Sequence, residues 1–122
     1  MAEAIAKHIN PSLWVDSAGT QSSYIRPQLR LVLDELDIDH RFLRSKDVFG
    51  VELEETTQVI VLCDPEEAPR LPKRLKLDFW GVPDPLCAPL HERQEAFLEC
   101  RDTLLSRIKA WLKQQDDIPT LD

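Results

Sequence analysis

The strongest constraint on the fold is one continuous apolar run, Val59-Ile60-Val61-Leu62, which stands between Gln58 and Cys63. β-Branched residues that do not alternate with polar ones are typical of a strand buried on both faces, as in a parallel sheet. Parallel strands need long crossover connections, which usually contain helices. The run at 58–63 therefore predicts an α/β domain in which helices flank a short parallel sheet.

Helical spacing of apolar residues recurs elsewhere in the chain. Ile5 and Ile9 lie four positions apart in a short amphipathic segment, which Asn10 and Pro11 end. Pro27 suits the first position of a second helix. The predicted helices are 2–9, a segment that begins at 27, 48–54 and 91–114. The predicted strands are 13–15, 58–63 and 75–80, with a glycine turn at 17–20 and a loop at 81–85.

The predicted helix at 91–114 has a single apolar stripe that would cover the core. Its members are Phe97, Leu98, the stem of Arg101, Leu104, Leu105, Ile108, Trp111 and Leu112. The segment 115–122 follows as a tail, which we expect to be loose. A chain of 122 residues suits one domain with one core, so we expect residues 1–122 to form a single domain.

The composition narrows the classes of function. The formal net charge is −7 and the pI is about 4.9, so the chain repels phosphate backbones and nucleic acid is not an expected partner. No apolar run is long enough to cross a bilayer, and the N-terminus shows no signal segment. The three cysteines, Cys63, Cys87 and Cys100, lack the spacing of a disulfide framework or a metal site. This favours free thiols in the cytoplasm, without a metal or another cofactor.

Five segments together resemble one known superfamily. They are MAEAIAKHI, VDSAGT, VIVLCD, FWGVPDP and the closing AFLECRDTLLSRIKAWL. In this order and spacing they resemble the low-molecular-weight protein tyrosine phosphatases, a superfamily that includes the thioredoxin-coupled arsenate reductases. The resemblance covers most of the chain and implies a three-layer α/β/α fold with a short parallel sheet. It also implies cysteine-dependent hydrolysis of phosphate monoesters or reduction of arsenate, with phosphate, arsenate or a phosphoprotein as the partner.

In that superfamily a first strand and a phosphate-binding loop, Cys-x5-Arg-Ser, stand immediately before the MAEA helix. The cysteine is the nucleophile and the arginine holds the phosphoryl oxygens. No Cys-x5-Arg-Ser occurs in the 122 residues, and the nearest run, CDPEEAPR, has one residue too many and no following serine. The thiolate needs such a loop to hold the oxyanion and to lower the cysteine pKa. We therefore expect the first strand and the loop to be missing and the chain as given to lack this activity.

The resemblance assigns Asp84, in the segment Pro83-Asp84-Pro85, to the general acid. Such an acid protonates the leaving oxygen and later activates water. The plainer interpretation is a proline-rich turn with a helpful aspartate. Ser17, Gly19 and Thr20 match the turn that supports the phosphate loop and binds substrate through it. The plainer interpretation, which we favour, is local hydrogen bonding in a glycine turn.

Cys63 is the redox candidate. In arsenate reductases of this fold a second cysteine lies at this point, and a third follows about seven residues later. Here the later position holds Pro69-Arg70 instead of a cysteine. The alternative role for Cys63 is that of a small buried apolar residue.

Two explanations of the absent loop remain open at this stage. The chain is either an N-terminally shortened form of an enzyme or a non-catalytic relative that binds a partner. The missing strand would lie between the strands predicted at 13–15 and 58–63. Its absence would leave strand edges without hydrogen-bond partners, which predicts a homodimer or a partner that donates a strand.

Overall fold

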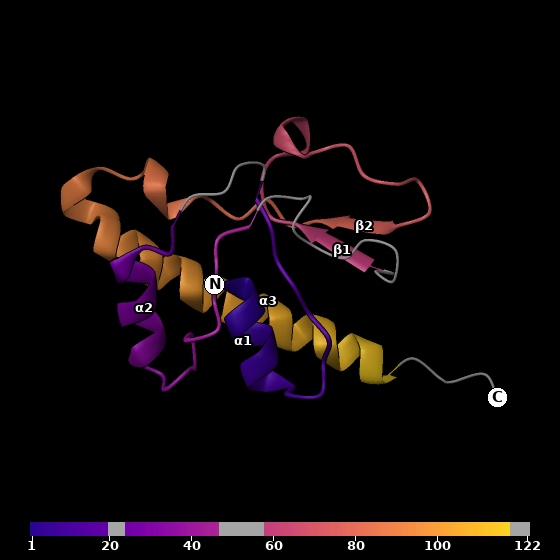
Figure 1. Cartoon of the computed structure of the whole chain (residues 1–122), viewed down its shortest axis with the longest axis horizontal. Coiled ribbons are helices and arrows are strands. Elements are labelled where there is room, and N and C mark those ends of the chain that lie inside the picture. The colour runs from indigo at the N-terminus through magenta and orange to yellow at the C-terminus, as the bar shows by residue number, and fades with distance from the viewer. Residues whose placement is uncertain (20–23, 47–57, 118–122) are drawn as a thin grey trace.

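The computed structural model describes residues 1–19, 24–46 and 58–117 (Figure 1). The described elements follow in the order α1 (Ala2–Ile9), α2 (Pro27–Asp34), β1 (Gln58–Val61), η2 (Pro65–Glu67), β2 (Lys76–Phe79), η3 (Pro85–Cys87), η4 (Leu90–Glu92) and α3 (Arg93–Asp117). The long helix α3 runs the length of the molecule, and α1 and α2 both pack on it. In Figure 1 the crossover that carries η2 lies on the other side of the sheet from α1 and α3.

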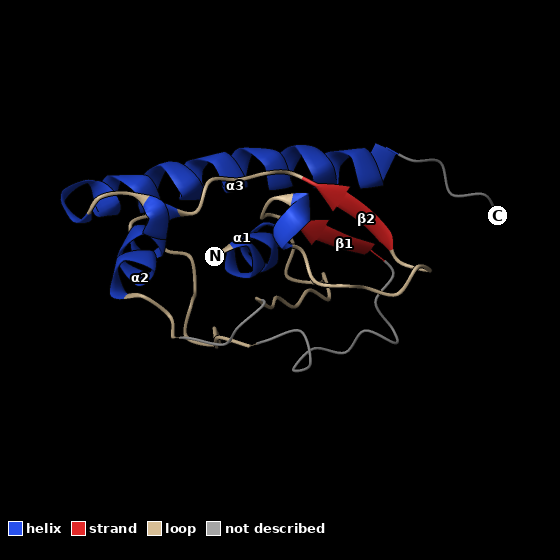
Figure 2. Cartoon of the chain, turned by 90° about the horizontal axis from the view of Figure 1, so that it is seen from above, coloured by secondary structure: helices blue, strands red, loops and turns tan. Residues whose placement is uncertain are grey.

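The sheet is short and parallel, as the apolar run predicted. The predicted burial on both faces is wrong for most of β1, since Val61 is buried but Val59 and Ile60 are only half-buried. β1 pairs with β2 in a register that sets Gln58 opposite Lys76 and Val61 opposite Phe79 (Figure 2). The pairing continues past the strands, because the Trp80 amide donates to the Val61 carbonyl at 2.9 Å. The predicted α/β fold with a short parallel sheet and flanking helices is therefore confirmed.

The strand predicted at 13–15 is wrong. The backbone there is not part of a ladder, and the sheet of the described residues contains only β1 and β2. A short apolar segment becomes a strand only when a neighbour accepts its backbone hydrogen bonds, and no described strand does so here. The Leu13 amide donates instead to the Asn10 carbonyl at 3.0 Å, and among the described residues of this segment a β-bridge forms only at Gly19, whose amide donates to the Lys46 carbonyl at 2.8 Å. The helix predicted at 48–54 lies outside the described residues.

α1 forms because its residues suit a helix at each end. Three alanines have high helix propensity, Glu3 stands in the first turn, and Lys7 and His8 stand in the last, which complements the helix dipole. Asn10 ends the helix in an extended conformation while its amide still donates to the Ala6 carbonyl, and Pro11 prevents continuation. The helix buries Glu3, Ala4, Ile5 and Ala6.

α3 confirms the predicted apolar stripe. Its buried members are Phe97, Arg101, Leu104, Ile108 and Leu112. The helix runs to Asp117, three residues past the predicted end at Gln114, so the loose tail predicted from residue 115 is wrong at 115–117. Residues 118–122 lie outside the described part of the chain.

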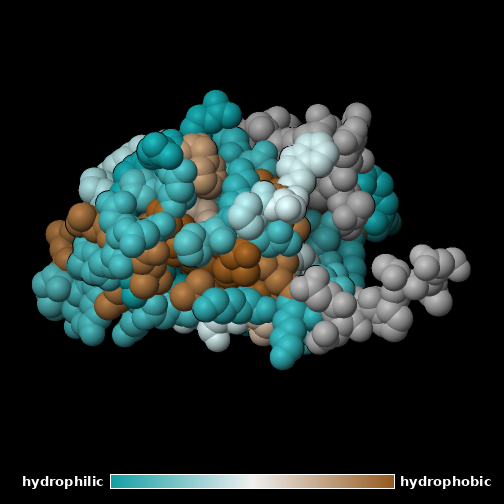
Figure 3. Space-filling model, turned by 90° about the horizontal axis from the view of Figure 1, so that it is seen from below, coloured by the Kyte–Doolittle hydropathy of each residue, from teal (hydrophilic) through white to brown (hydrophobic). Residues whose placement is uncertain are grey.

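The core lies among the three helices and the ends of the strands. Its fully buried side chains come from all three helices and the segment after α2, and include Ile5, Leu33, Ile38 and Leu104. Leu62, Trp80 and Val82, which follow the strands, pack against this core. Figure 3 shows apolar residues gathered in a central band on one face, with hydrophilic residues on both sides of it.

Arg101 joins the end of α2 to α3. Its buried guanidinium donates through Nη1 to the Val32 carbonyl at 2.8 Å and to Glu35 Oε2 at 2.7 Å, and through Nε to Asp102 Oδ1 at 2.9 Å. Burial lowers the pKa of Arg101, but the two carboxylates outweigh burial and raise it. Among the described residues, no helix combines the length and apolarity that a membrane span requires.

Candidate active site

A pocket of about 270 Å³ lies at the N-terminal end of α1. Met1 and Ala2 line it from the helix, Asp84 from the loop after β2, and Cys100 from α3. The rest of its wall is mainly apolar, with Ile25, Leu29, Leu62, Leu86, Phe97 and Leu104 among the lining residues. The start of a helix and a carboxylate are thereby brought to one cavity from segments far apart in the chain.

The loop around Asp84 holds its carboxylate in a defined position. Asp84 is the N-cap of η3, and its Oδ1 accepts a hydrogen bond from the Leu86 amide at 2.9 Å. Pro83 and Pro85 limit the backbone on both sides of it. Among the described contacts none involves Oδ2, and the residue is exposed. The carboxylate can therefore exchange a proton with a ligand while its other oxygen fixes the loop.

The charges around the pocket do not activate the Cys100 thiol. Burial raises the pKa of Cys100, the Met1 ammonium opposes this, and the Asp84 carboxylate adds to it. Burial also lowers the pKa of the Met1 amino group. A thiol with a raised pKa is protonated near neutral pH and is a poor nucleophile. Cys100 is therefore a half-buried wall residue of the pocket.

Arg26 brings a cation to the same pocket. It is the N-cap residue of α2, and its guanidinium lies 4.1 Å from the centre of the Tyr24 ring and donates to the Tyr24 hydroxyl. Both side chains line the pocket together with Asp84. Nothing in the local sequence marks Arg26 as a site residue, because the pocket forms only when α2 packs beside α3.

Ser17 and Gly19 do not line this pocket. The Ser17 hydroxyl instead donates to Glu3 Oε1 at 2.7 Å, and the Gly19 amide donates to the Lys46 carbonyl. Thr20 lies outside the described residues. The structure therefore places the described part of the predicted turn against the first turn of α1 and the segment near Lys46.

An ionic network surrounds the buried carboxylate of Glu3, which sequence reasoning did not single out. Glu3 is only 4% exposed, and its carboxylate lies 3.3 Å from Lys7 Nζ and 3.6 Å from Lys46 Nζ. Lys46 also contacts Asp16 Oδ1 at 2.6 Å. Burial raises the pKa of Asp16, but hydrogen bonds from Lys46 and the Ser17 amide outweigh burial and lower it. The network fixes the 16–19 turn to the first turn of α1.

The three cysteines differ in their exposure and surroundings. All three are free; Cys63 and Cys100 are half-buried, and Cys87 is exposed. Cys63 comes two residues after β1 and does not line the Asp84 pocket, although its neighbour Leu62 does. Cys63 is thus not among the residues that line the pocket of the predicted acid.

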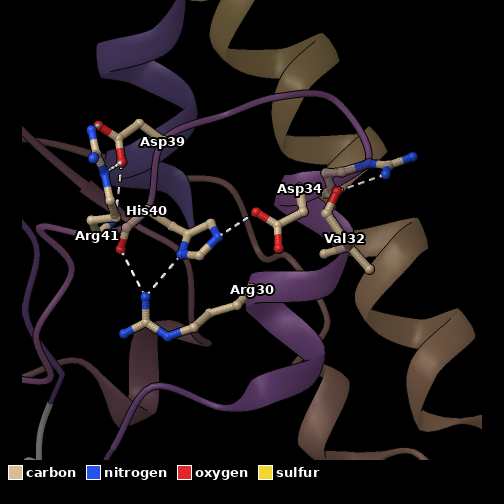
Figure 4. Close-up of polar contacts among 7 residues, drawn as sticks. Arg30, Val32, Asp34, Asp39, His40 and Arg41 are labelled. Atoms are coloured by element: carbon tan, nitrogen blue, oxygen red, sulfur yellow. Dashed lines mark hydrogen bonds and ion pairs between the residues drawn. The ribbon is translucent and has the colours of Figure 1, made fainter.

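A second polar cluster lies at the end of α2 (Figure 4). Arg30 Nη1 lies 2.9 Å from His40 Nδ1, and His40 Nε2 lies 2.6 Å from Asp34 Oδ1. A guanidinium can only donate, so Nδ1 accepts and the proton of the neutral imidazole sits on Nε2, where it reaches the carboxylate. The cluster closes the turn after α2. Within 1–19, 24–46 and 58–117, no group of three His, Cys, Asp or Glu residues could hold a metal ion.

Two known proteins that are similar to this chain are named arsenate reductases. No family model matches the chain. Arsenate reductase 1 of Staphylococcus haemolyticus (strain JCSC1435) is 31% identical over 112 residues, which are 89% of this chain and 81% of that protein. Arsenate reductase 2 of Staphylococcus saprophyticus is 30% identical over 112 residues, 89% of this chain and 82% of that protein. This chain belongs to the arsenate reductase family.

Solved structures of arsenate reductases share the fold. One in the reduced state superposes with a TM-score of 0.73, at 24% identity, over 93% of this chain and 86% of its own. The enzyme of Archaeoglobus fulgidus DSM 4304 superposes with a TM-score of 0.68, at 16% identity, over 88% of this chain and 87% of its own. Together with the relatives that are 30% and 31% identical, this shared fold confirms the predicted superfamily of low-molecular-weight phosphatases and arsenate reductases. The predicted absence of the first strand and the nucleophile loop stays a prediction.

Proposed function

We propose that the pocket at the start of α1 is the acid side of an oxyanion site for arsenate or phosphate, with Asp84 as the general acid. The observation that carries this proposal is that Asp84 and the N-terminal end of α1 line one pocket. A helix N-terminus favours an anion because its free N–H groups and its dipole point toward the ligand. Membership of the arsenate reductase family supports an oxyanion as the substrate class.

The chemistry of the site needs two parts. A cysteine thiolate attacks the substrate, and an acid protonates the oxygen that leaves. Asp84 can supply the second part, since one carboxylate oxygen fixes the loop while the exposed side chain remains accessible. The thiols of the chain do not match the first part, because no cysteine is followed by x5-Arg-Ser. We therefore propose that a polypeptide of these 122 residues alone does not turn over arsenate or phosphate esters.

A turnover assay tests this proposal on the 122-residue polypeptide. We expect no hydrolysis of an aryl phosphate and no thiol-dependent reduction of arsenate above the rate without protein. Asp84→Ala and Cys63→Ser should leave that baseline unchanged. Turnover that falls in Asp84→Ala would show a different nucleophile in the chain. Turnover that falls in Cys63→Ser instead would support the redox role predicted for that thiol.

The second candidate is a non-catalytic binding module that a homodimer or a partner strand completes. The observation that favours it is the position of β1, which pairs with β2 on one edge while no described strand pairs with its other edge. An extended peptide can add to such an edge through backbone hydrogen bonds. Protection of the outward-facing β1 amides from hydrogen exchange upon addition of a strand-forming peptide would support it.

A cytoplasmic location is part of the same proposal. The three cysteines are free, and one of them is exposed. Free thiols are typical of a reducing compartment. Fractionation of the source cells with an antibody to this chain tests the location directly.

A further inference from the structure

The outer edge of β2 is open among the described residues. All four residues of the strand, Lys76 to Phe79, are exposed. The Leu77 side chain is 40% exposed and the Phe79 side chain is 46% exposed. β1 occupies one edge of β2, and no described strand occupies the other. An open edge presents unpaired N–H and C=O groups that a second strand can pair with.

The ladder fixes which backbone groups face outward. The Trp80 amide donates to the Val61 carbonyl, so Asp78 and Lys76, two and four positions before Trp80, direct their backbone groups toward β1. The alternate residues, Leu77 and Phe79, therefore direct their N–H and C=O groups toward the open edge. The side chains alternate too, so Leu77 and Phe79 share one face of the sheet and the two charged residues share the other.

The strand is complementary to itself in one antiparallel register. If a two-fold axis passes through Leu77, each Leu77 faces the Leu77 of the second copy as a hydrogen-bonded pair, and Phe79 faces Leu75. Lys76 then faces the second copy's Asp78 in a non-hydrogen-bonded pair, where side chains approach most closely. The axis repeats this opposite-charge pair, so the charged face contains two of them. Because only Leu77 and Phe79 direct their backbone groups outward, this register uses the groups that the edge presents.

We propose that two copies of this chain associate through β2, antiparallel and centred on Leu77, to form a continuous four-stranded sheet. The occupant of the edge is a second copy because the charge order Lys76–Asp78 matches itself only when the strand runs the other way. Charged residues on an edge strand usually prevent pairing with another chain. Here Lys76 and Asp78 have opposite charges, so in one register of a two-fold pair they attract their counterparts in the second copy. This interface is separate from the β1 edge and does not depend on the proposed oxyanion site.

Charge-reversal variants test the interface by sedimentation equilibrium of the full chain. We expect a concentration-dependent dimer, and Asp78→Lys or Lys76→Asp should each raise the dimer Kd by about tenfold, because like charges then face each other twice. The double variant Lys76→Asp/Asp78→Lys restores opposite charges and should return the Kd to near that of the native chain. An equimolar mixture of the two single variants should form a heterodimer for the same reason.

Two controls make the result decisive. Glu95→Lys changes the net charge by the same amount as Asp78→Lys at an exposed site on α3, and it should leave the Kd unchanged. Amide NMR of the native chain should show that the Leu77 and Phe79 amides gain protection with concentration. A chain that stays monomeric to about 1 mM overturns the proposal, as does a dimer whose Kd the charge reversals and the double variant leave unchanged.

Discussion

Glu3 is a single carboxylate whose burial depends on the cations around it. Lys7 and Lys46 neutralise it, and Ser17 donates a hydrogen bond to it. Glu3→Ala leaves Lys46 and the Ser17 hydroxyl without this partner, so we expect a loss of about 2 kcal/mol in the free energy of unfolding. Urea unfolding measures it. Glu99→Ala, an exposed site on α3, is the control and should change stability by less than about 0.5 kcal/mol. Equal midpoints for the two variants would contradict the role of the network.

Asp16 gives the same network a pH dependence. Its folded-state pKa lies below the ordinary value of 3.8, so the native state holds the carboxylate charged more strongly than the unfolded chain does. The stabilisation is therefore fully present above about pH 4 and is lost as pH falls through the lowered pKa. Asp16→Asn should reduce the acid-induced loss of stability, with little change in slope above pH 5. A native-like acid limb in the variant, measured by urea unfolding between pH 2 and 6, would show that Asp16 does not contribute.

At the scale of elements, Arg101 decides how α2 meets α3. It is the residue that satisfies the Val32 carbonyl near the end of α2 while it pairs with Glu35. Arg101→Ala should lower the free energy of unfolding by about 3 kcal/mol, because a buried carbonyl and a carboxylate lose their partner. Arg101→Lys keeps the charge but loses the planar set of donors, so its free energy of unfolding should lie between those of the native chain and Arg101→Ala. Lys109→Ala, exposed on the same helix, is the matched control for thermal unfolding.

The position of each cysteine in its element predicts its reactivity. Cys87 ends η3 and is exposed, whereas Cys100 lies half-buried on α3 with a raised pKa. At pH 8 an alkylating reagent should therefore modify Cys87 at least about tenfold faster than Cys100. Peptide mass mapping over time reports both rates, and Cys87→Ser removes the fast phase. A fast phase that persists in Cys87→Ser and maps to Cys100 would contradict the pocket environment described for that thiol.

At the scale of the whole molecule, the sequence predicted those elements whose position depends on a short-range pattern of residues. The stripe on α3 buries one continuous surface, so its periodicity is enough to place it; the β-branched run at 58–63 places β1 by composition, although only Val61 in it is buried. The segment 13–15 has the composition of a strand but no described neighbour to pair with, and pairing cannot be read from a local pattern.

Residues of the candidate site also differ in whether a local sequence pattern could mark them. Asp84 could be predicted because the resemblance and the flanking prolines mark it within one short segment. The contact of Glu3 with Lys46 and the place of Arg26 in the pocket could not, since each joins side chains from segments separated by whole elements. Electrostatic partners of this kind depend on tertiary packing, which one sequence alone does not specify.

The most direct test of the central claim adds the nucleophile loop that the proposed chemistry requires. A chimera places a strand and a Cys-x5-Arg-Ser loop ahead of Met1, and its hydrolysis of phenyl phosphate and of nitrophenyl phosphate is measured. If Asp84 is the general acid, Asp84→Asn should lower kcat/KM, which reports the step in which the ester oxygen leaves, by about 100-fold on phenyl phosphate, a poor leaving group, and far less on the nitrophenyl ester. An equal effect on both substrates, or an active chimera that Asp84→Asn does not impair, would contradict the claim that this pocket is the acid side of an oxyanion site.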